Sequence, residues 1–177
     1  MIETDRLLVR PPEETDRARF VELFTDETFT VFSGGVHDLA SANERFDGML
    51  ALAGQIPFAK QPVIEKATGT IVGYTGVGTV EFEGAVRLEW GWRFDAPARG
   101  LGYATEATTA LLEVAGRHAD GEVLCIIDVR NEPSRRVADK VGFRWWRQYV
   151  WPEFPDDTTD LLLATIGRGG EPLLAPS

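Results

Sequence analysis

The segment of residues 57–94 constrains the fold more than any other, because its apolar residues follow the period of β-strands and its connections are short. The letters "FAKQPVIEKATGTIVGYTGVGTVEFEGAVRLEWGWRF" predict three strands, joined by turns at Ala67-Thr68-Gly69 and at Glu83-Gly84. Strands joined by turns this short run antiparallel to each other. The segment therefore predicts an antiparallel meander in the middle of the chain.

Helices and further strands surround this meander. A first strand at residues 6–10 ends at two prolines, and apolar spacing predicts helices at 15–25 and 41–53, the second opened by a capping box of Ser41 and Glu44. After the meander come a predicted helix at 103–118, a buried strand at 123–129, a short helix at 133–142, and strands at 143–151 and 160–166. This order predicts an α+β fold, with a mixed, mainly antiparallel sheet and helices on its faces.

Composition fits one ordinary globular domain, with 44% hydrophobic and 26% charged residues. We expect residues 1–166 to form this domain and residues 167–177 to be a flexible tail. The single cysteine, Cys125, allows no internal disulfide and gives no metal-site spacing, so we expect a cytoplasmic protein without a metal. Neither a signal peptide nor a run of about 18 apolar residues is visible, so we expect no membrane partner.

The formal net charge of −10 argues against nucleic acid as a partner, because duplex binding needs a concentrated basic surface. An acidic chain suits a cationic or amine-bearing substrate, although solubility alone explains the acidity equally well.

Residues 99–107, "RGLGYATEA", follow the last strand of the meander and lead directly into a predicted helix. A helix N-terminus has unpaired N–H groups and the positive end of the helix dipole, so it can bind anions. Gly100 and Gly102 have no side chain and would let an anion reach the backbone. A tight turn that needs glycine for steric reasons is the alternative explanation of this loop.

A dinucleotide site is one form of this anion hypothesis, because "GLGYAT" matches G-x-G-x-x-G with Thr105 at the third glycine. That motif belongs to the first strand of a parallel βαβ unit, with an acidic residue closing the next strand. Here it follows an antiparallel meander, and Glu122 precedes the next strand. The position of the motif therefore disfavours an NAD(P)-dependent oxidoreductase.

A closer match is to a family of acetyltransferases. Arg99-x-x-Gly102-x-Ala104 resembles the R/Q-x-x-G-x-G/A loop of the GNAT superfamily of N-acetyltransferases, which holds the acetyl-coenzyme A pyrophosphate. Residues 131–143, "NEPSRRVADKVGF", resemble the family's second motif, N-x-x-S followed by a helix and K-x-G-F. The N-terminal "TDRLLVRP" is similar to the opening of the branch that contains the ribosomal-protein alanine N-acetyltransferases. The resemblance covers residues 4–166 in the family's order.

This resemblance implies about seven strands and four helices, with the fourth and fifth strands splayed apart to admit the pantetheine arm of acetyl-coenzyme A. It also implies which residues bind this co-substrate. In the fourth strand they are Trp92, Arg93 and Phe94, which act through their backbone. In the pyrophosphate loop they are Arg99, Gly100, Leu101, Gly102, Tyr103, Ala104 and Thr105. The pantetheine contacts are Asn131 and Ser134.

Ser134 is the catalytic candidate that the resemblance supplies, since in this branch the serine of N-x-x-S lies near the thioester sulfur. A hydroxyl at a helix N-terminus can stabilise the leaving thiolate, although a first-turn serine is also common for structural reasons. Tyr149 is a fallback for this role. The general base is harder to predict: Glu89 in "RLEWGW" leads, ahead of Asp128, Glu153 and Asp160.

Other reactive side chains have simpler interpretations. Cys125 lies in an apolar strand and is expected to be a buried core thiol. We expect His37 and His118 to be structural or surface residues. Trp145 and Trp146 are adjacent in a strand, so one indole should face outward, against a helix, a partner or an acceptor pocket.

The resemblance implies direct attack of a primary amine on acetyl-coenzyme A, without a covalent enzyme intermediate. The acceptor stays open between a protein N-terminus, a small amine such as an antibiotic or a polyamine, and an amino-acid-like amine. The donor could carry a larger acyl group, such as succinyl. The alternative from another class is a catalytically silent coenzyme A-binding domain. A homodimer is the family expectation.

Overall fold

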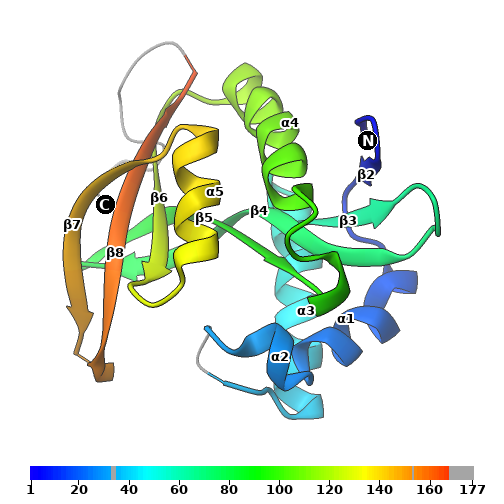
Figure 1. Cartoon of the computed structure of the whole chain (residues 1–177), viewed down its shortest axis with the longest axis horizontal. Coiled ribbons are helices and arrows are strands. Elements are labelled where there is room, and N and C mark those ends of the chain that lie inside the picture. The colour runs from blue at the N-terminus through cyan, green and yellow to red at the C-terminus, as the bar shows by residue number, and fades with distance from the viewer. Residues whose placement is uncertain (33–34, 153, 168–177) are drawn as a thin grey trace. The chain divides into compact units, whose positions relative to one another are not determined.

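The computed structural model describes residues 1–32, 35–152 and 154–167 (Figure 1). Within these residues, hydrogen bonds join eight strands into one mixed sheet, in the order β1-β2-β3-β4-β5-β6-β8-β7. The strands are β1 Ile2–Glu3, β2 Leu7–Val9, β3 Gln61–Glu65, β4 Ile71–Phe82, β5 Ala85–Phe94, β6 Gly121–Asp128, β7 Arg144–Trp151 and β8 Phe154–Ile166. The helices are α1 Arg17–Phe24, α2 Glu27–Thr30, α3 Leu39–Ala53, α4 Tyr103–His118 and α5 Glu132–Val141, with short 3-10 turns η1 Glu14–Asp16 and η2 Ala96–Ala98.

The predicted α+β class is confirmed, and so is the meander of β3, β4 and β5. The structure has eight strands and five α-helices in the described residues, close to the predicted seven or so and four or so. The additional elements, β1 and the one-turn helix α2, are too short to show a period. None of the described helices is long and apolar enough to cross a membrane.

The chain divides into two compact units. The N-terminal unit comprises Met1–Gly76 and Trp92–Val114, and the C-terminal unit comprises Val77–Gly91 and the chain from Ala115 onward. Strands β4 and β5 contribute residues to both. Each unit is described below by itself.

Two apolar clusters cover opposite faces of the sheet in the N-terminal unit. Because neighbouring strand residues point to opposite faces, Ile64 and Ile71 belong to the first cluster, while Val63 and Val72 belong to the second. The first cluster, under helices α1 to α3, is rich in aromatic rings: Phe20, Phe24, Phe29, Phe46 and Tyr74. The second lies under α4 and includes Phe94, Tyr103 and Ala107.

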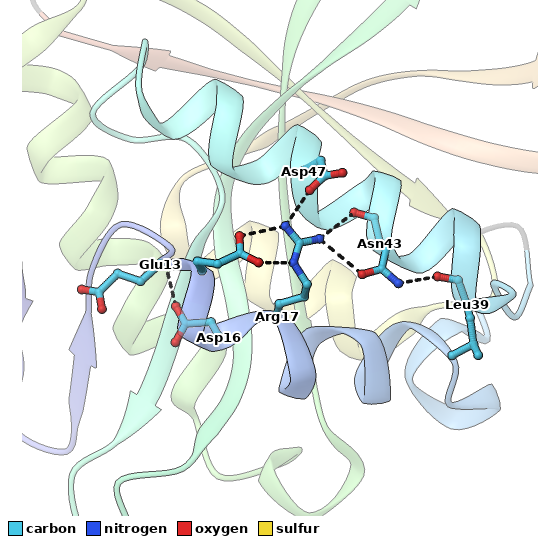
Figure 2. Close-up of polar contacts among 7 residues, drawn as sticks. Glu13, Asp16, Arg17, Leu39, Asn43 and Asp47 are labelled. Atoms are coloured by element: carbon cyan, nitrogen blue, oxygen red, sulfur yellow. Dashed lines mark hydrogen bonds and ion pairs between the residues drawn. The ribbon is translucent and has the colours of Figure 1, made fainter.

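Polar contacts join α1 to α3 on the first face (Figure 2). Arg17 donates to Glu14 in η1 and, at 2.6 Å, to the carboxylate of Asp47 in α3. It also donates to the side chain of Asn43, whose amide donates in turn to the carbonyl of Leu39 at 2.7 Å. These bonds fix the first turns of α3 on α1.

Helix α3 begins two residues earlier than the sequence pattern predicted. Asp38 is its N-cap, and its carboxylate accepts from the backbone N–H of Ser41 at 2.8 Å and from the Ser41 hydroxyl at 2.7 Å. The predicted capping box of Ser41 and Glu44 is therefore wrong. A carboxylate and a hydroxyl are both good caps, and the one three residues upstream is used here.

In the C-terminal unit, β5 and β6 are parallel, and β8 pairs antiparallel with both β6 and β7. The described parallel register joins Glu89 to Leu124, whereas the β6–β8 ladder runs from Gly121↔Ile166 to Asp128↔Thr159. A parallel pairing this short is what the predicted divergence of these two strands requires. Helix α5 packs beside β6 (Figure 1).

The outer strand β7 does not alternate as predicted. Its register with β8 shifts between Trp145 and Arg147, so Trp146 is an extra, bulged residue. Both indoles are consequently exposed, Trp145 by 55% and Trp146 by 42%, instead of one alone. Cys125 is buried, which confirms the prediction of a core thiol. The predicted tail lies almost wholly outside the described residues.

Candidate functional site

The loop before α4 has the conformation that the two glycines suggested. Arg99 is extended, with φ −76° and ψ 150°, whereas Gly100 and Gly102 have φ of 77° and 85°. Only glycine adopts such positive values without strain. The first helical hydrogen bond runs from the Glu106 N–H to the Gly102 carbonyl at 3.1 Å. The N–H groups just before it have no acceptor within an α-helix, so they are available to an anion.

The connection between β1 and β2 holds this loop in place. Nη1 of Arg6 donates to the carbonyl of Leu101 at 2.8 Å, and Nε donates to the Glu106 carboxylate at 2.8 Å. The backbone N–H of Arg6 and the hydroxyl of Thr4 donate to the other oxygen of Glu106, at 3.0 and 2.6 Å. A Cβ at position 102 would lie 3.4 Å from Nη2 of Arg6. That distance is an ordinary contact, so the positive φ, and not a lack of space, is what favours glycine at this position.

Glu106 is a carboxylate in the first turn of the helix that would receive the anion. Although partial burial opposes it, hydrogen bonds from Thr4 and Arg6 lower the pKa of Glu106 below its ordinary value. The carboxylate is thus charged and is neutralised by Arg6. Without that neighbour, a fixed negative charge would stand beside the proposed phosphate position.

Two further side chains support the loop. The Tyr103 hydroxyl donates to Glu65 in β3 at 2.5 Å, and the guanidinium of Arg6 lies 4.7 Å from the centroid of the Tyr103 ring. Arg99 donates to two carbonyls, that of Phe94 at 2.9 Å and that of Thr28 at 2.6 Å. The Arg99 side chain therefore ties the loop to β5 and α2.

The last three residues of β5, Trp92, Arg93 and Phe94, belong to the N-terminal unit. Phe94 is 6% exposed and belongs to the cluster under α4, and Trp92 packs against the same cluster. Arg93 points to the opposite face, over the rings of Phe29 and Tyr74. The strand passes so close to β4 that a Cβ on Gly73 would lie 2.2 Å from the Arg93 carbonyl oxygen.

Asn131 and Ser134 lie together at the start of α5 in the C-terminal unit. Asn131 is the N-cap, and its side-chain oxygen accepts from the backbone N–H of Ser134 at 3.2 Å. Ser134 is therefore the third helical residue, and its hydroxyl makes no hydrogen bond to the described part of the chain. Gly142 ends the helix with φ 98°, as the pattern predicted.

The loop before α4 and the start of α5 carry the motifs on which the family resemblance rests. Comparison with known proteins shows whether the chain belongs to that family. The model of the acetyltransferase (GNAT) domain matches residues 6–144 of this chain. The chain belongs to the GNAT family. As a member, it is an N-acetyltransferase that uses acetyl-coenzyme A.

This GNAT acetyltransferase is similar to individual proteins in sequence and in fold. The uncharacterized protein YkkB of Bacillus subtilis is 28% identical over 144 residues, which are 80% of this chain and 84% of YkkB. A GNAT-family acetyltransferase from Bacillus anthracis has the same fold, with a TM-score of 0.76 over 93% of this chain and 97% of that one, at 22% identity. A spermidine N-acetyltransferase from Vibrio cholerae, solved with CoA and spermine, has a TM-score of 0.73 over 92% and 97% at 10% identity.

The candidate bases of the acetyltransferase differ in what surrounds them. Asp128 is bonded to Arg130 at 2.8 Å, and this bond, against partial burial, lowers the pKa of Asp128. Asp160 is 1% exposed and is bound by Arg135 and by the Trp145 indole N–H, so it is a buried, paired carboxylate. Glu153 lies outside the described residues. Glu89, half-buried in β5, stays the leading candidate.

The ring of Tyr149 packs among other aromatic side chains. Its ring packs edge-on against Phe82 and Trp151, with centroids 5.0 and 5.1 Å apart. The aromatic packing explains the ring at this position, and the fallback role of its hydroxyl stays a prediction.

Sequence reasoning missed Arg6 and Thr4 as parts of the site, although both lie in the quoted "TDRLLVRP". One signal could have found them. A carboxylate in the first turn after a proposed anion loop, Glu106, needs a cation nearby, and that cation is supplied here from 100 residues upstream.

Proposed function

We propose that this acetyltransferase moves the acetyl group of acetyl-coenzyme A to a primary amine by direct attack within a ternary complex. The amine nitrogen forms a bond to the thioester carbonyl carbon, the carbon–sulfur bond breaks, and the amine proton leaves to a base. The products are an N-acetylated amine and coenzyme A. The observation that carries the proposal is the anion-ready loop, with Gly100 and Gly102 at positive φ ahead of α4 and Glu106 neutralised by Arg6.

The residues proposed to bind acetyl-coenzyme A act mostly through their backbone. The N–H groups of Gly100 to Thr105 would hold the pyrophosphate, since neither glycine adds a Cβ and the helix dipole favours negative charge. The backbone of Trp92, Arg93 and Phe94 would pair with the amides of the pantetheine arm, as the family resemblance implies. Arg99 acts on the loop conformation through its bonds to carbonyls.

Ser134 and Glu89 are the proposed catalytic residues. The Ser134 hydroxyl sits in the first turn of α5, where the helix dipole lowers the cost of a developing negative charge, so it can donate to the leaving thiolate. Glu89 would accept the amine proton, directly or through water. The similarity of "TDRLLVRP" to the ribosomal-protein alanine N-acetyltransferases supports a place near that branch.

A calorimetric titration with acetyl-coenzyme A tests the proposal, using Gly102→Ala and the matched control Gly69→Ala. Both glycines have positive φ, 85° and 71°, so alanine should strain either by about 1–2 kcal/mol. Only position 102 lies in the proposed cradle. We expect Gly102→Ala to weaken acetyl-coenzyme A binding at least tenfold, and Gly69→Ala to leave it unchanged.

The same titration, run with succinyl-coenzyme A and NADP and followed by an amine screen for coenzyme A release, separates the alternatives. Tighter binding of the succinyl form would indicate that succinyl-coenzyme A, and not acetyl-coenzyme A, is the donor. Acetyl-coenzyme A binding with no amine-dependent release would indicate a silent binding domain. NADP binding without coenzyme A binding would overturn the proposal.

A further inference from the structure

Two side chains of the N-terminal unit bury a polar atom that has no hydrogen-bond partner among the described residues. These atoms are Nη1 of Arg93, in β5, and Nε2 of His37, in the segment between α2 and α3. A buried polar group left unpaired is unfavourable, because it has lost its hydrogen bonds to water and gained none. Two such atoms in one unit are therefore candidate donors to a bound ligand.

Both side chains contact rings of one aromatic cluster. The guanidinium carbon of Arg93 lies 5.6 Å from the centroid of Phe29 and 5.7 Å from that of Tyr74. The His37 ring packs edge-on against Phe24 at 6.2 Å, and Phe24 in turn packs against Phe29 and Tyr74 at 6.2 and 6.3 Å. The two unpaired atoms thus belong to one region of the face under α1 to α3.

Two further cations lie against the rings of this region, although the chain as a whole is acidic. The guanidinium of Arg45, in α3, lies 5.8 Å from the centroid of Phe24, and the ammonium of Lys60 lies 5.8 Å from that of Tyr74. Burial, with the charges of Arg45 and Arg93, lowers the pKa of His37 despite the opposing charge of Asp38.

The nearby carboxylate of Asp38 already accepts hydrogen bonds from other donors. It accepts both the backbone N–H and the hydroxyl of Ser41 at the start of α3. An imidazole can donate from Nε2, and the Arg93 guanidinium donates from Nη1. An acceptor of negative charge would satisfy both donors at once.

The position of Arg93 shows that this anion is not the coenzyme A pyrophosphate. Adjacent strand residues point to opposite faces of the sheet. Phe94 packs in the cluster under α4, the helix that follows the glycine loop, whereas Arg93 packs on the rings under α1 to α3. The ligand group that Arg93 would bind is therefore on the other face of the sheet from α4.

We propose that Arg93, His37 and Arg45 bind a carboxylate of the acceptor, so that the acetyl acceptor is an amino-acid-like amine and not a polyamine or an aminoglycoside. The inference rests on the proposed function. The planar guanidinium suits a carboxylate because it offers parallel N–H donors, and the aromatic rings beneath it exclude water. The segment that bears His37 also exposes Val31, Phe32 and Val36, which suits an apolar acceptor side chain.

Paired acceptors test this proposal: L-leucine and L-phenylalanine against their carboxamides, with spermidine as a third class. The assay compares kcat/KM for the acid and the amide in wild type, Arg93→Met and His37→Phe, the last keeping the aromatic contact with Phe24. Arg87→Met is the control, because Arg87 is an exposed arginine of the same strand. Acetyl-coenzyme A titration confirms that each variant is folded and loads its donor.

We expect wild type to prefer the acids at least tenfold. Arg93→Met should abolish that preference by raising KM for the acids alone, His37→Phe should reduce it, and Arg87→Met should leave it unchanged. Acetylation of spermidine or the carboxamides in preference to the acids would overturn the proposal while leaving the acetyltransferase function standing. Loss of acetyl-coenzyme A binding in the wild type would instead overturn the function.

A second measurement needs no turnover. N-acetyl-L-leucine and its carboxamide, the corresponding products, are titrated into the coenzyme A complex. Arg93-dependent binding of the acid over the amide supports the subsite. Equal binding of the two, or a preference that survives in Arg93→Met, contradicts it.

Discussion

Arg6 is the residue on which the shape of the glycine loop depends most directly. One guanidinium bonds to the Leu101 carbonyl and to the Glu106 carboxylate, so it sets the loop conformation and neutralises the charge next to it. Removing it should act in two ways. The loop loses a fixed carbonyl, and Glu106 is left as an uncompensated charge at the helix end that would bind phosphate.

We therefore predict that Arg6→Met weakens acetyl-coenzyme A binding about tenfold, or about 1.4 kcal/mol, measured by calorimetry. The double variant Arg6→Met/Glu106→Gln should recover part of this loss, because the repelling carboxylate is gone. A double-mutant cycle measures the recovery. If the double variant binds no better than Arg6→Met, the charge argument fails and Arg6 acts through the loop conformation alone.

Local signals let the sequence predict the loop but not the residues that hold it. Gly102 and Gly142 could be placed because each occupies a position of positive φ at a helix end, which the neighbouring letters already suggest. The partners Arg6 and Glu106 are 100 residues apart, and no local pattern links them. The same holds for Asp160, whose burial with Arg135 and Trp145 depends on how β7 and β8 pair.

Element boundaries depended on competing caps and on pairing. Helix α4 was predicted with its observed bounds, because a glycine loop precedes it and its apolar face is long. Helix α3 was misplaced because Asp38 and Ser41 are both good caps, and only the structure shows that Asp38 is used. The bulge at Trp146 could not be predicted, since it arises from the register with a strand that follows later in the chain.

The start of helix α5 allows structural and ligand roles to be separated. Asn131→Asp keeps an oxygen that can cap the Ser134 N–H but removes the amide donors. If Asn131 binds the pantetheine arm, this variant should keep its stability and lose about tenfold in acetyl-coenzyme A affinity, or about 1.4 kcal/mol. Asn131→Ala should lose about 1 kcal/mol of stability as well, by chemical denaturation.

Ser134→Ala is the companion variant at the same helix start. Its hydroxyl is not used in the described capping, so its stability should change by less than about 0.5 kcal/mol. If the hydroxyl donates to the leaving thiolate, kcat should fall by about 100-fold with little change in acetyl-coenzyme A affinity. If Asn131→Asp keeps its affinity for acetyl-coenzyme A and Ser134→Ala keeps its kcat, then this helix start has a capping role only.

At the scale of the whole molecule, the net charge opposes the proposed ligands. A chain of formal charge −10 repels both the phosphates of coenzyme A and a carboxylate acceptor at long range, while Arg93, Arg45 and the helix α4 N-terminus attract them at short range. Salt screens charges beyond about 8–10 Å at physiological strength, so it removes the repulsion first.

We predict that the association rate of acetyl-coenzyme A rises between low salt and about 0.15 M, measured by stopped flow, because the long-range field is the term that salt weakens most there. Pantetheine, which has no phosphate, is the matched probe and should show a flat profile. A rate that falls steeply with salt would mean that the positive groups around the site dominate the field that the ligand meets. The acidity of the chain would then have no bearing on how its substrates arrive.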